Sequence, residues 1–192
     1  PCATGTLLWQ RRSACDEGLP QPHRAASSPG GDICTGGWPM SRRSAGLLLY
    51  RRPPTGVEVL LVHPGGPYWR RQDAGAWSVP KGEYGPQESP EAAARREMME
   101  ETGLVVGTPL LPLGTIRQKG GKEVTAFATE GDFDPATLVS NSFEMEWPPR
   151  SGHTVSFPEV DQARWFPLAE ARIRLLPAQV PFLHRLEQAL YR

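Results

Sequence analysis

The strongest structural signal in the sequence is one helix whose two ends are both marked. Residues 82–104 read GEYGPQESPEAAARREMMEETGL. Ser89 is a typical N-cap residue, Pro90 follows at the first helical position, and Gly103 comes just past the expected last turn. The stretch therefore predicts a helix that begins at Pro90, ends before Gly103 and is entered through a glycine-containing loop.

Short apolar segments bounded by Pro and Gly surround this helix and predict a sheet. The expected strands are Ala45–Tyr50, Val57–His63, AWSVPKG, Leu110–Gln118, Glu123–Thr129 and QARWF. Residues 177–191 predict a closing amphipathic helix with Val180, Leu183, Leu186 and Leu190 on one side. In contrast, FEMEWPPRSGH is too rich in proline to be read as a strand. Strands interleaved with a few helices predict an α/β (α+β) fold with a mixed sheet covered by helices.

Domain organisation follows from composition. Residues 1–39 are rich in Gly, Pro, Ser and Arg and show no sustained hydrophobic period, so we interpret them as a disordered or non-native leader. Met40 is then the expected natural start of a domain spanning residues 40–192, and a functional N-terminal tail is the alternative. Cys2, Cys15 and Cys34 all precede residue 40, which argues against a disulfide framework or a zinc site.

Charge and hydropathy exclude some classes of partner. Lys and Arg together number 21, as do Asp and Glu, so no net positive field favours nucleic acid. No apolar run approaches the roughly 18 residues that a membrane helix needs. We therefore expect neither a nucleic-acid nor a membrane partner, and a cytoplasmic location.

The predicted helix carries three glutamates within reach of one another. Glu97 and Glu101 are one turn apart, and Glu100 lies three residues from Glu97. Like charges at this spacing repel unless a cation lies between them, and Mg²⁺ is the natural one, with Mn²⁺ as a second possibility. A solvated helix face is the ordinary alternative, but the neighbours here are arginines, and Arg96 can pair with Glu100 or reach back to Glu88. The loop PKGEYGPQ, with Gly82 and Gly85, brings backbone groups near the helix start, so we expect loop and helix to form one site.

The stretch resembles the box of the Nudix hydrolase (MutT-like) family. Gly82, Glu88, Arg96-Glu97, apolar Met98, Glu100-Glu101, Gly103 and apolar Leu104 match that pattern in order. The strand SAGLLLY, the entry WSVPKGE and the segment EVDQARWFPLAEA also look like landmarks of the family. Within the family, the chain is most similar to a bacterial group of predicted NTP pyrophosphohydrolases. The resemblance implies a Nudix-type α/β/α sandwich.

The resemblance also implies roles for individual residues. Glu97, Glu100 and Glu101 would bind the divalent metals together with the main-chain carbonyl of Lys81, and Glu88 with Arg96 would form a supporting ion pair. A further metal carboxylate is expected from a later segment. Glu159, six residues before Trp165, fits that place, with Glu144 and Glu146 as rivals. The general base is left open among Glu97, Glu100 and Glu159.

Cations and one aromatic residue outside the helix are candidates for holding the rest of a substrate. They are Arg70, Arg71, Lys81, Arg117, Lys119, Lys122, Trp147 and Arg150. Each cation is alternatively a solvated surface charge, and Trp147 either offers an aromatic face to a base or packs on the core. His63 and His153 have no Cys or His partner at ligand spacing, so we interpret both as structural or surface residues.

These features together predict Mg²⁺-dependent hydrolysis of a phosphoanhydride bond by water. The expected substrate is a nucleoside diphosphate linked to another group, such as a nucleoside triphosphate, a dinucleoside polyphosphate or a nucleotide sugar. The alternative is a Nudix-like module that binds a nucleotide without cleaving it. Monomer and homodimer are both open.

Overall fold

The computed structural model describes residues 42–191, so the predicted leader lies outside the described part of the chain. Its main sheet contains β1 (Arg43–Arg51), β2 (Glu58–Pro64), β3 (Lys81–Glu83), β4 (Leu111–Arg117), β5 (Glu123–Glu130) and β8 (Val160–Pro167). The strand order is β4-β5-β1-β2-β8, with β3 also paired to β1. Strands β1 and β5 run parallel and the other pairs are antiparallel, so the sheet is mixed, as predicted.

The sheet is buried on both faces, and β1 shows why. Successive side chains of a strand point to opposite faces. Leu47 packs in one cluster with Ala94 and Met98 of α2 (Pro90–Thr102), whereas Leu48 packs in the opposite cluster with Phe182 of α4 (Val180–Leu190). Each fully buried leucine contributes about 1.5–3 kcal/mol relative to an exposed one.

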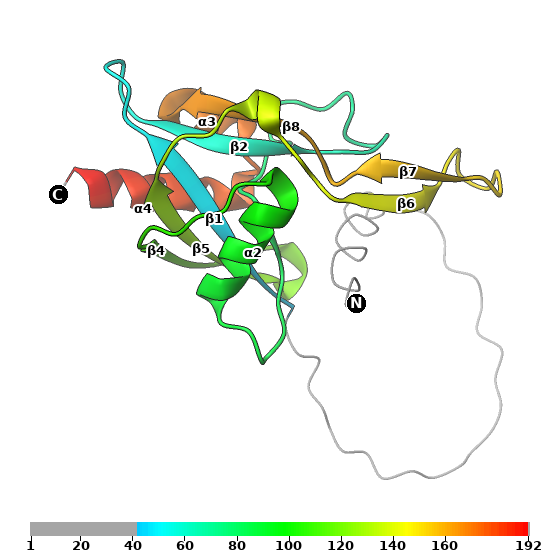
Figure 1. The fold of residues 1–192 in the computed structure, drawn as a ribbon, viewed down its shortest axis with the longest axis horizontal. Helices are drawn as coiled ribbons and strands as arrows, with labels where there is room; N and C mark the ends of the chain where they lie inside the picture. Colours follow the sequence, from blue (N-terminus) through cyan, green and yellow to red (C-terminus); the bar gives the residue numbers. More distant parts are fainter. Residues whose placement is uncertain (1–41, 192) are drawn as a thin grey trace, which may run out of the picture.

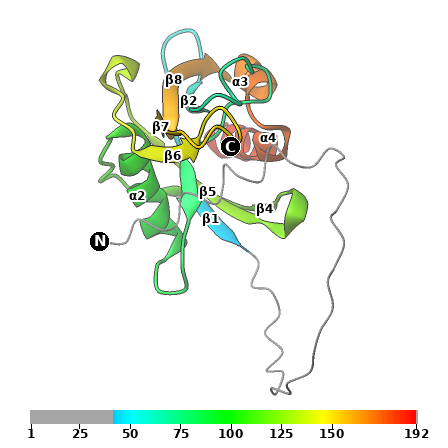
Figure 2. The same cartoon turned by 90° about the vertical axis from the view of Figure 1, so that its right-hand side faces the viewer.

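Helices cover each face of this sheet. Helix α2 lies on one side, and α3 (Leu168–Arg174) and α4 lie on the other (Figures 1 and 2). This three-layer arrangement confirms the predicted α/β/α sandwich with a mixed sheet.

Helix α2 has the ends that the sequence predicts. The backbone N–H of Ala92 donates to Ser89 Oγ at 3.1 Å, and Gly103 adopts a left-handed conformation with φ 81°. Glycine is favoured there because it carries no Cβ to clash in this region.

The segment AWSVPKG is only partly the strand that was predicted. Its last residues form β3, which pairs with the beginning of β1, while Trp77 and Ser78 make isolated bridges. Ser78 bridges to Val62 of β2, and the N–H of Leu47 in β1 donates to the carbonyl of Pro80 at 3.0 Å. The segment therefore connects the ends of β1 and β2 where these two strands no longer pair directly.

Two further expectations need correction. The stretch FEMEWPPRSGH is not irregular throughout, because β6 (Ser142–Glu146) pairs with β7 (Thr154–Pro158) as a separate hairpin. The closing helix begins at Val180 after a 3₁₀ turn at Pro177–Gln179, and it buries Phe182 together with the predicted Leu183 and Leu186. The short helix α3 was not predicted.

Between residues 42 and 191, no helix is both long enough and apolar enough to cross a membrane.

Candidate active site

Glu97 of α2 is directed at β3 and not at solvent. Glu97 is only 3% exposed, although it is an ionisable residue in the middle of a charged sequence. A Cβ placed on Gly82 would lie 2.0 Å from the Glu97 carboxylate, so this carboxylate occupies the space that any larger residue at position 82 would need. The glycine of the loop and the first glutamate of the predicted cluster are therefore one structural unit.

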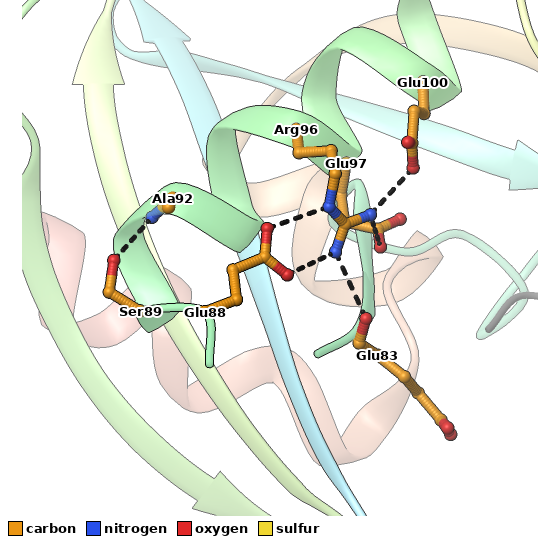
Figure 3. Close-up of polar contacts among 7 residues, drawn as sticks. All are labelled: Glu83, Glu88, Ser89, Ala92, Arg96, Glu97 and Glu100. Atoms are coloured by element: carbon orange, nitrogen blue, oxygen red, sulfur yellow. Dashed lines mark hydrogen bonds and ion pairs between the residues drawn. The ribbon is translucent and has the colours of Figure 1, made fainter. Parts of the chain in front are cut away.

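Arg96 joins the entry loop to the acidic face of α2 (Figure 3). Its Nε and Nη2 donate to the two carboxylate oxygens of Glu88, each at 2.9 Å. Nη1 donates to Glu97 at 2.6 Å and to Glu100 at 2.8 Å, and Nη2 also donates to the carbonyl of Glu83 at 3.2 Å. Glu88 and Arg96 thus form a bidentate ion pair that links the entry loop to α2. The same guanidinium also orients Glu97 and Glu100, two of the candidate metal ligands.

Glu101 and Glu159 meet at a small pocket beside Lys81. The backbone N–H of Lys81 donates to Glu101 Oε2 at 3.1 Å. Lys81, Glu101 and Glu159 line this pocket with Val62, Pro64, Ser78 and Val160, and the pocket is partly open to solvent. Residues from β2, β3, α2 and the β7–β8 junction therefore converge on one place.

Four carboxylates of the site interact electrostatically: those of Glu97, Glu100, Glu101 and Glu159. Burial raises the pKa of Glu159 to about 7, and the nearby charges of Glu97 and Glu100 raise it further in the same direction. Burial also raises the pKa of Glu97, against the opposing effect of Arg96.

Burial also shifts the pKa values of Glu101 and Lys81, which lie next to each other in the site. Burial raises the pKa of Glu101, against the opposing charge of Lys81, and burial lowers the pKa of the Lys81 side chain. Glu97 and Glu159 add negative charge around Glu101. Arg96, Lys81 and Lys122 are the cations that influence this cluster, so Glu97, Glu100, Glu101 and Glu159 outnumber the positive groups around them.

This donor set fits a hard divalent cation by its chemistry. Crowded, desolvated carboxylate oxygens on a glycine-lined surface are what Mg²⁺ binds together with phosphate oxygens. Within the described residues, no three Asp, Glu, His or Cys side chains are already gathered into a ligand shell. The reason is visible in the contacts, because Arg96 engages Glu97 and Glu100 while the Lys81 N–H engages Glu101.

Glu144 and Glu146, the alternatives to Glu159 as an additional metal ligand, do not line the pocket. Glu144 and Glu146 are exposed residues of β6, and Glu146 Oε1 accepts from the N–H of Gly152 at the hairpin turn. Glu159 is the one among these three that lines the pocket with Glu101.

The predicted substrate-binding residues fall into separate groups. Arg70 and Arg71 are exposed in the loop after β2, and Arg150 is exposed in the turn of the β6–β7 hairpin. Tyr68 of that loop contacts Trp147 of the hairpin, with ring centroids 5.5 Å apart in an edge-to-face arrangement.

The second group lies at the turn between β4 and β5. Arg117 is exposed at the end of β4, and the side chain of Lys119 lies outside what the structure describes. Lys122 is mostly buried and its Nζ donates to Glu83 Oε1 at 3.1 Å. Glu83 is therefore not simply a solvated residue of the loop, because it pairs with Lys122 and lies near Arg42.

Comparisons with known proteins agree with this geometry. The NUDIX domain family model matches residues 40–186. No curated protein matches the chain significantly. Among solved structures, the NUDIX domain of Shewanella oneidensis NrtR complexed with ADP ribose aligns with a TM-score of 0.58 at 16% identity, covering 83% of this chain and 94% of that one.

Two other structures show the same fold. A C. elegans Ap4A hydrolase binary complex aligns with a TM-score of 0.55 at 20% identity, over 77% of this chain and 97% of that one. A mutT/nudix family protein from Listeria innocua aligns with a TM-score of 0.52 at 22% identity, over 78% and 93% of the two chains. Since the family model covers most of its length, the chain belongs to the NUDIX domain family and is an enzyme of the Nudix hydrolase type.

Proposed function

We propose that this protein hydrolyses a phosphoanhydride bond in a nucleoside diphosphate linked to another group, with Mg²⁺ as the metal and Mn²⁺ as a possible substitute. The observation that carries the proposal is the convergence of Glu97, Glu101 and Glu159 around Lys81, next to a glycine loop. Clustered carboxylates with few compensating cations are suited to a divalent metal and a phosphate chain.

In this proposal, some residues of the site bind the metal and others hold those residues in position. Glu97, Glu100, Glu101, Glu159 and the carbonyl of Lys81 would hold the metal. When bound, Mg²⁺ would supply positive charge to the phosphoryl oxygens and acidify water. The N–H of Lys81 fixes Glu101, and the Glu88–Arg96 pair fixes the loop to α2.

The chemical step needs a proton acceptor. Water attacks one phosphorus, the bond from that phosphorus to the bridging oxygen breaks, and the bridging oxygen leaves with the other phosphoryl group. Each product therefore carries a terminal phosphate, and the water's proton passes to a carboxylate. Glu97, Glu100 and Glu159 remain the candidates for this base.

The similar structures suggest which substrates to test. Of the similar structures named above, one is complexed with ADP ribose and another is an Ap4A hydrolase, and both compounds contain a nucleoside linked through phosphates. Nucleoside triphosphates, dinucleoside polyphosphates and nucleotide sugars therefore form the panel that we would test first.

One experiment tests the proposal. The full chain is incubated with ADP ribose, Ap4A and nucleoside triphosphates, with Mg²⁺ or with EDTA, and phosphate and nucleotide products are separated by chromatography. We expect hydrolysis that EDTA abolishes, that Glu101→Gln removes and that the exposed Glu91→Gln retains. Hydrolysis by Glu101→Gln at the wild-type rate would contradict the assignment of the site.

The alternative is a module that binds a nucleotide without cleaving it. It would show saturable binding of ADP ribose or Ap4A in calorimetry and no product with Mg²⁺. The complete set of acidic residues on α2 favours hydrolysis over binding alone. A cytoplasmic location and a monomeric or homodimeric state stay predictions from the sequence.

A further inference from the structure

An exposed aromatic pair lies beside the candidate active site. Tyr68 is 45% exposed although it is a large apolar side chain, and Trp147 is partly exposed. The two rings come from segments that are far apart in the sequence, yet they touch edge to face. Ring faces left open to solvent are unfavourable surfaces that commonly mark binding sites.

Both segments are anchored next to Glu159. The N–H of Gly65 donates to the carbonyl of Glu159 at 2.9 Å, and the N–H of Glu159 donates to the carbonyl of Asn141 at 2.8 Å. A Cβ on Gly65 would lie 2.0 Å from the carbonyl oxygen of Pro158, so the loop after β2 is pressed against the base of the hairpin. Figure 1 shows this loop and the β6–β7 hairpin leaving the sheet at the same end.

The loop is held in place along its length. His63 contacts the carbonyl of Gln72 at 2.9 Å, and the side chain of Gln72 donates to the carbonyl of Tyr68 at 3.1 Å. Tyr68 is therefore supported by fixed backbone, which lowers the entropy lost when a ligand is bound.

Chain length limits how far the pair can be from the metal site. Tyr68 is three residues from Gly65, so their Cα atoms are at most about 10–11 Å apart. Because the N–H of Gly65 donates to the carbonyl of Glu159, this limit keeps the backbone of Tyr68 close to the backbone of Glu159.

The charges around the pair suit an anionic ligand. Arg70 and Arg71 follow Tyr68 closely in sequence, and Arg150 lies three residues after Trp147. All three are exposed, and none forms a hydrogen bond or ion pair with another residue between 42 and 191. Open guanidinium groups next to aromatic faces match a ligand that combines a planar ring with phosphates.

We propose that Tyr68 and Trp147 form the subsite for the nucleobase of the substrate, while its diphosphate reaches the carboxylates at Lys81. This inference rests on the proposed function and adds that the substrate is recognised through its base. Trp147 is then a specificity-determining residue, and the hairpin β6–β7 is the element that carries it.

Binding of two probes to the full chain with Mg²⁺ tests the subsite. ADP carries a base and inorganic pyrophosphate does not, so calorimetry with each separates base recognition from phosphate recognition. Stacking of a base on an aromatic side chain contributes about 1–3 kcal/mol, which is roughly a 5- to 150-fold change in Kd. We expect Trp147→Ala and Tyr68→Ala each to weaken ADP binding at least 5-fold and to leave pyrophosphate binding unchanged.

Tyr191→Ala is the matched control, because it removes an exposed aromatic ring at the end of α4. It should leave both affinities unchanged. Equal binding of ADP by wild type and Trp147→Ala would overturn the subsite, as would wild-type ADP binding no tighter than pyrophosphate binding. Neither result would affect Mg²⁺-dependent hydrolysis, which is measured separately. A short single-stranded RNA that competes at Trp147 more strongly than ADP would overturn the mononucleotide assignment.

Discussion

The carboxylate of Glu97 fills the space directly above Gly82. Its oxygens would lie 2.0–2.1 Å from a Cβ at that position, far closer than any real contact. Glu97 is nearly completely buried and is also tied to Arg96, so it has little room to move aside. A single methyl group on Gly82 must therefore displace either the carboxylate or β3.

Gly82→Ala is predicted to lower kcat/KM by about 100-fold, because a shift of about 1 Å in a catalytic group costs on this order. Gly85→Ala is the matched control. A Cβ on Gly85 meets nothing within 4 Å, and Gly85 lies in the loop that follows β3, three residues after Gly82. Kinetics with the best substrate of the panel, together with circular dichroism to verify folding, would check the pair. Equal activity of both variants would contradict the packing argument.

The local part of this site was predictable from the sequence. The caps of α2 and the spacing of Glu97, Glu100 and Glu101 depend only on neighbouring residues, and Ser89 and Gly103 cap the helix as expected. The expectation that these glutamates share a surface follows from helix periodicity alone. The burial of Glu97 against Gly82 could not be read from the same pattern, because it depends on where β3 pairs with β1.

The parts that were missed depend on distant contacts or weak patterns. The hairpin β6–β7 buries Phe143 and leaves most of its other side chains exposed, so it lacks the alternating apolar signal of a half-buried strand. Helix α3 has seven residues, too few for a clear helical period. The pair of Glu83 with Lys122 joins residues 39 positions apart, and no local signal predicts it.

The brace between Glu88 and Arg96 should contribute to stability. Charged hydrogen bonds contribute about 1.5–3 kcal/mol each when well shielded, but both side chains here are about one-third exposed, which reduces the effect. We expect Glu88→Gln to lower the free energy of unfolding by about 1 kcal/mol, measured as a shift of the urea midpoint. Glu91→Gln, which removes an exposed partner of Arg95, should change it by less than about 0.5 kcal/mol. The reverse order would contradict the bracing role.

His63 should make folding stability depend on pH. Its Nδ1 lies 2.8 Å from Asp161 Oδ1 and its Nε2 lies 2.9 Å from the carbonyl of Gln72, and both partners are acceptors. Burial lowers the pKa of His63, but the bonds to Asp161 and Gln72 outweigh it and leave the pKa above the usual value. The stabilisation is therefore complete below the unfolded pKa of about 6.5 and is lost as pH rises through the folded pKa.

The difference in unfolding free energy between wild type and His63→Gln should therefore be larger at pH 5.5 than at pH 9. Urea unfolding at the two pH values measures it, and His153→Gln, at an exposed hairpin position, gives the background. A difference that is the same at both pH values would mean that protonation of His63 does not contribute.

The identity of the later metal carboxylate can be decided between Glu159 and Glu144. Glu159 lines the pocket with Glu101, whereas Glu144 is exposed on β6. A ligand at 100 times its Kd stabilises the folded state by about 2.7 kcal/mol, so Mg²⁺ should raise the melting temperature of the wild-type chain. We expect Glu159→Gln to reduce both this rise and the rate of hydrolysis, and Glu144→Gln to change neither. If Glu144→Gln alone lost the Mg²⁺-dependent rise in melting temperature, the additional metal ligand would be Glu144 on the hairpin and not Glu159. The melting temperature without Mg²⁺ serves as the control, because loss of a metal ligand should leave the metal-free protein folded.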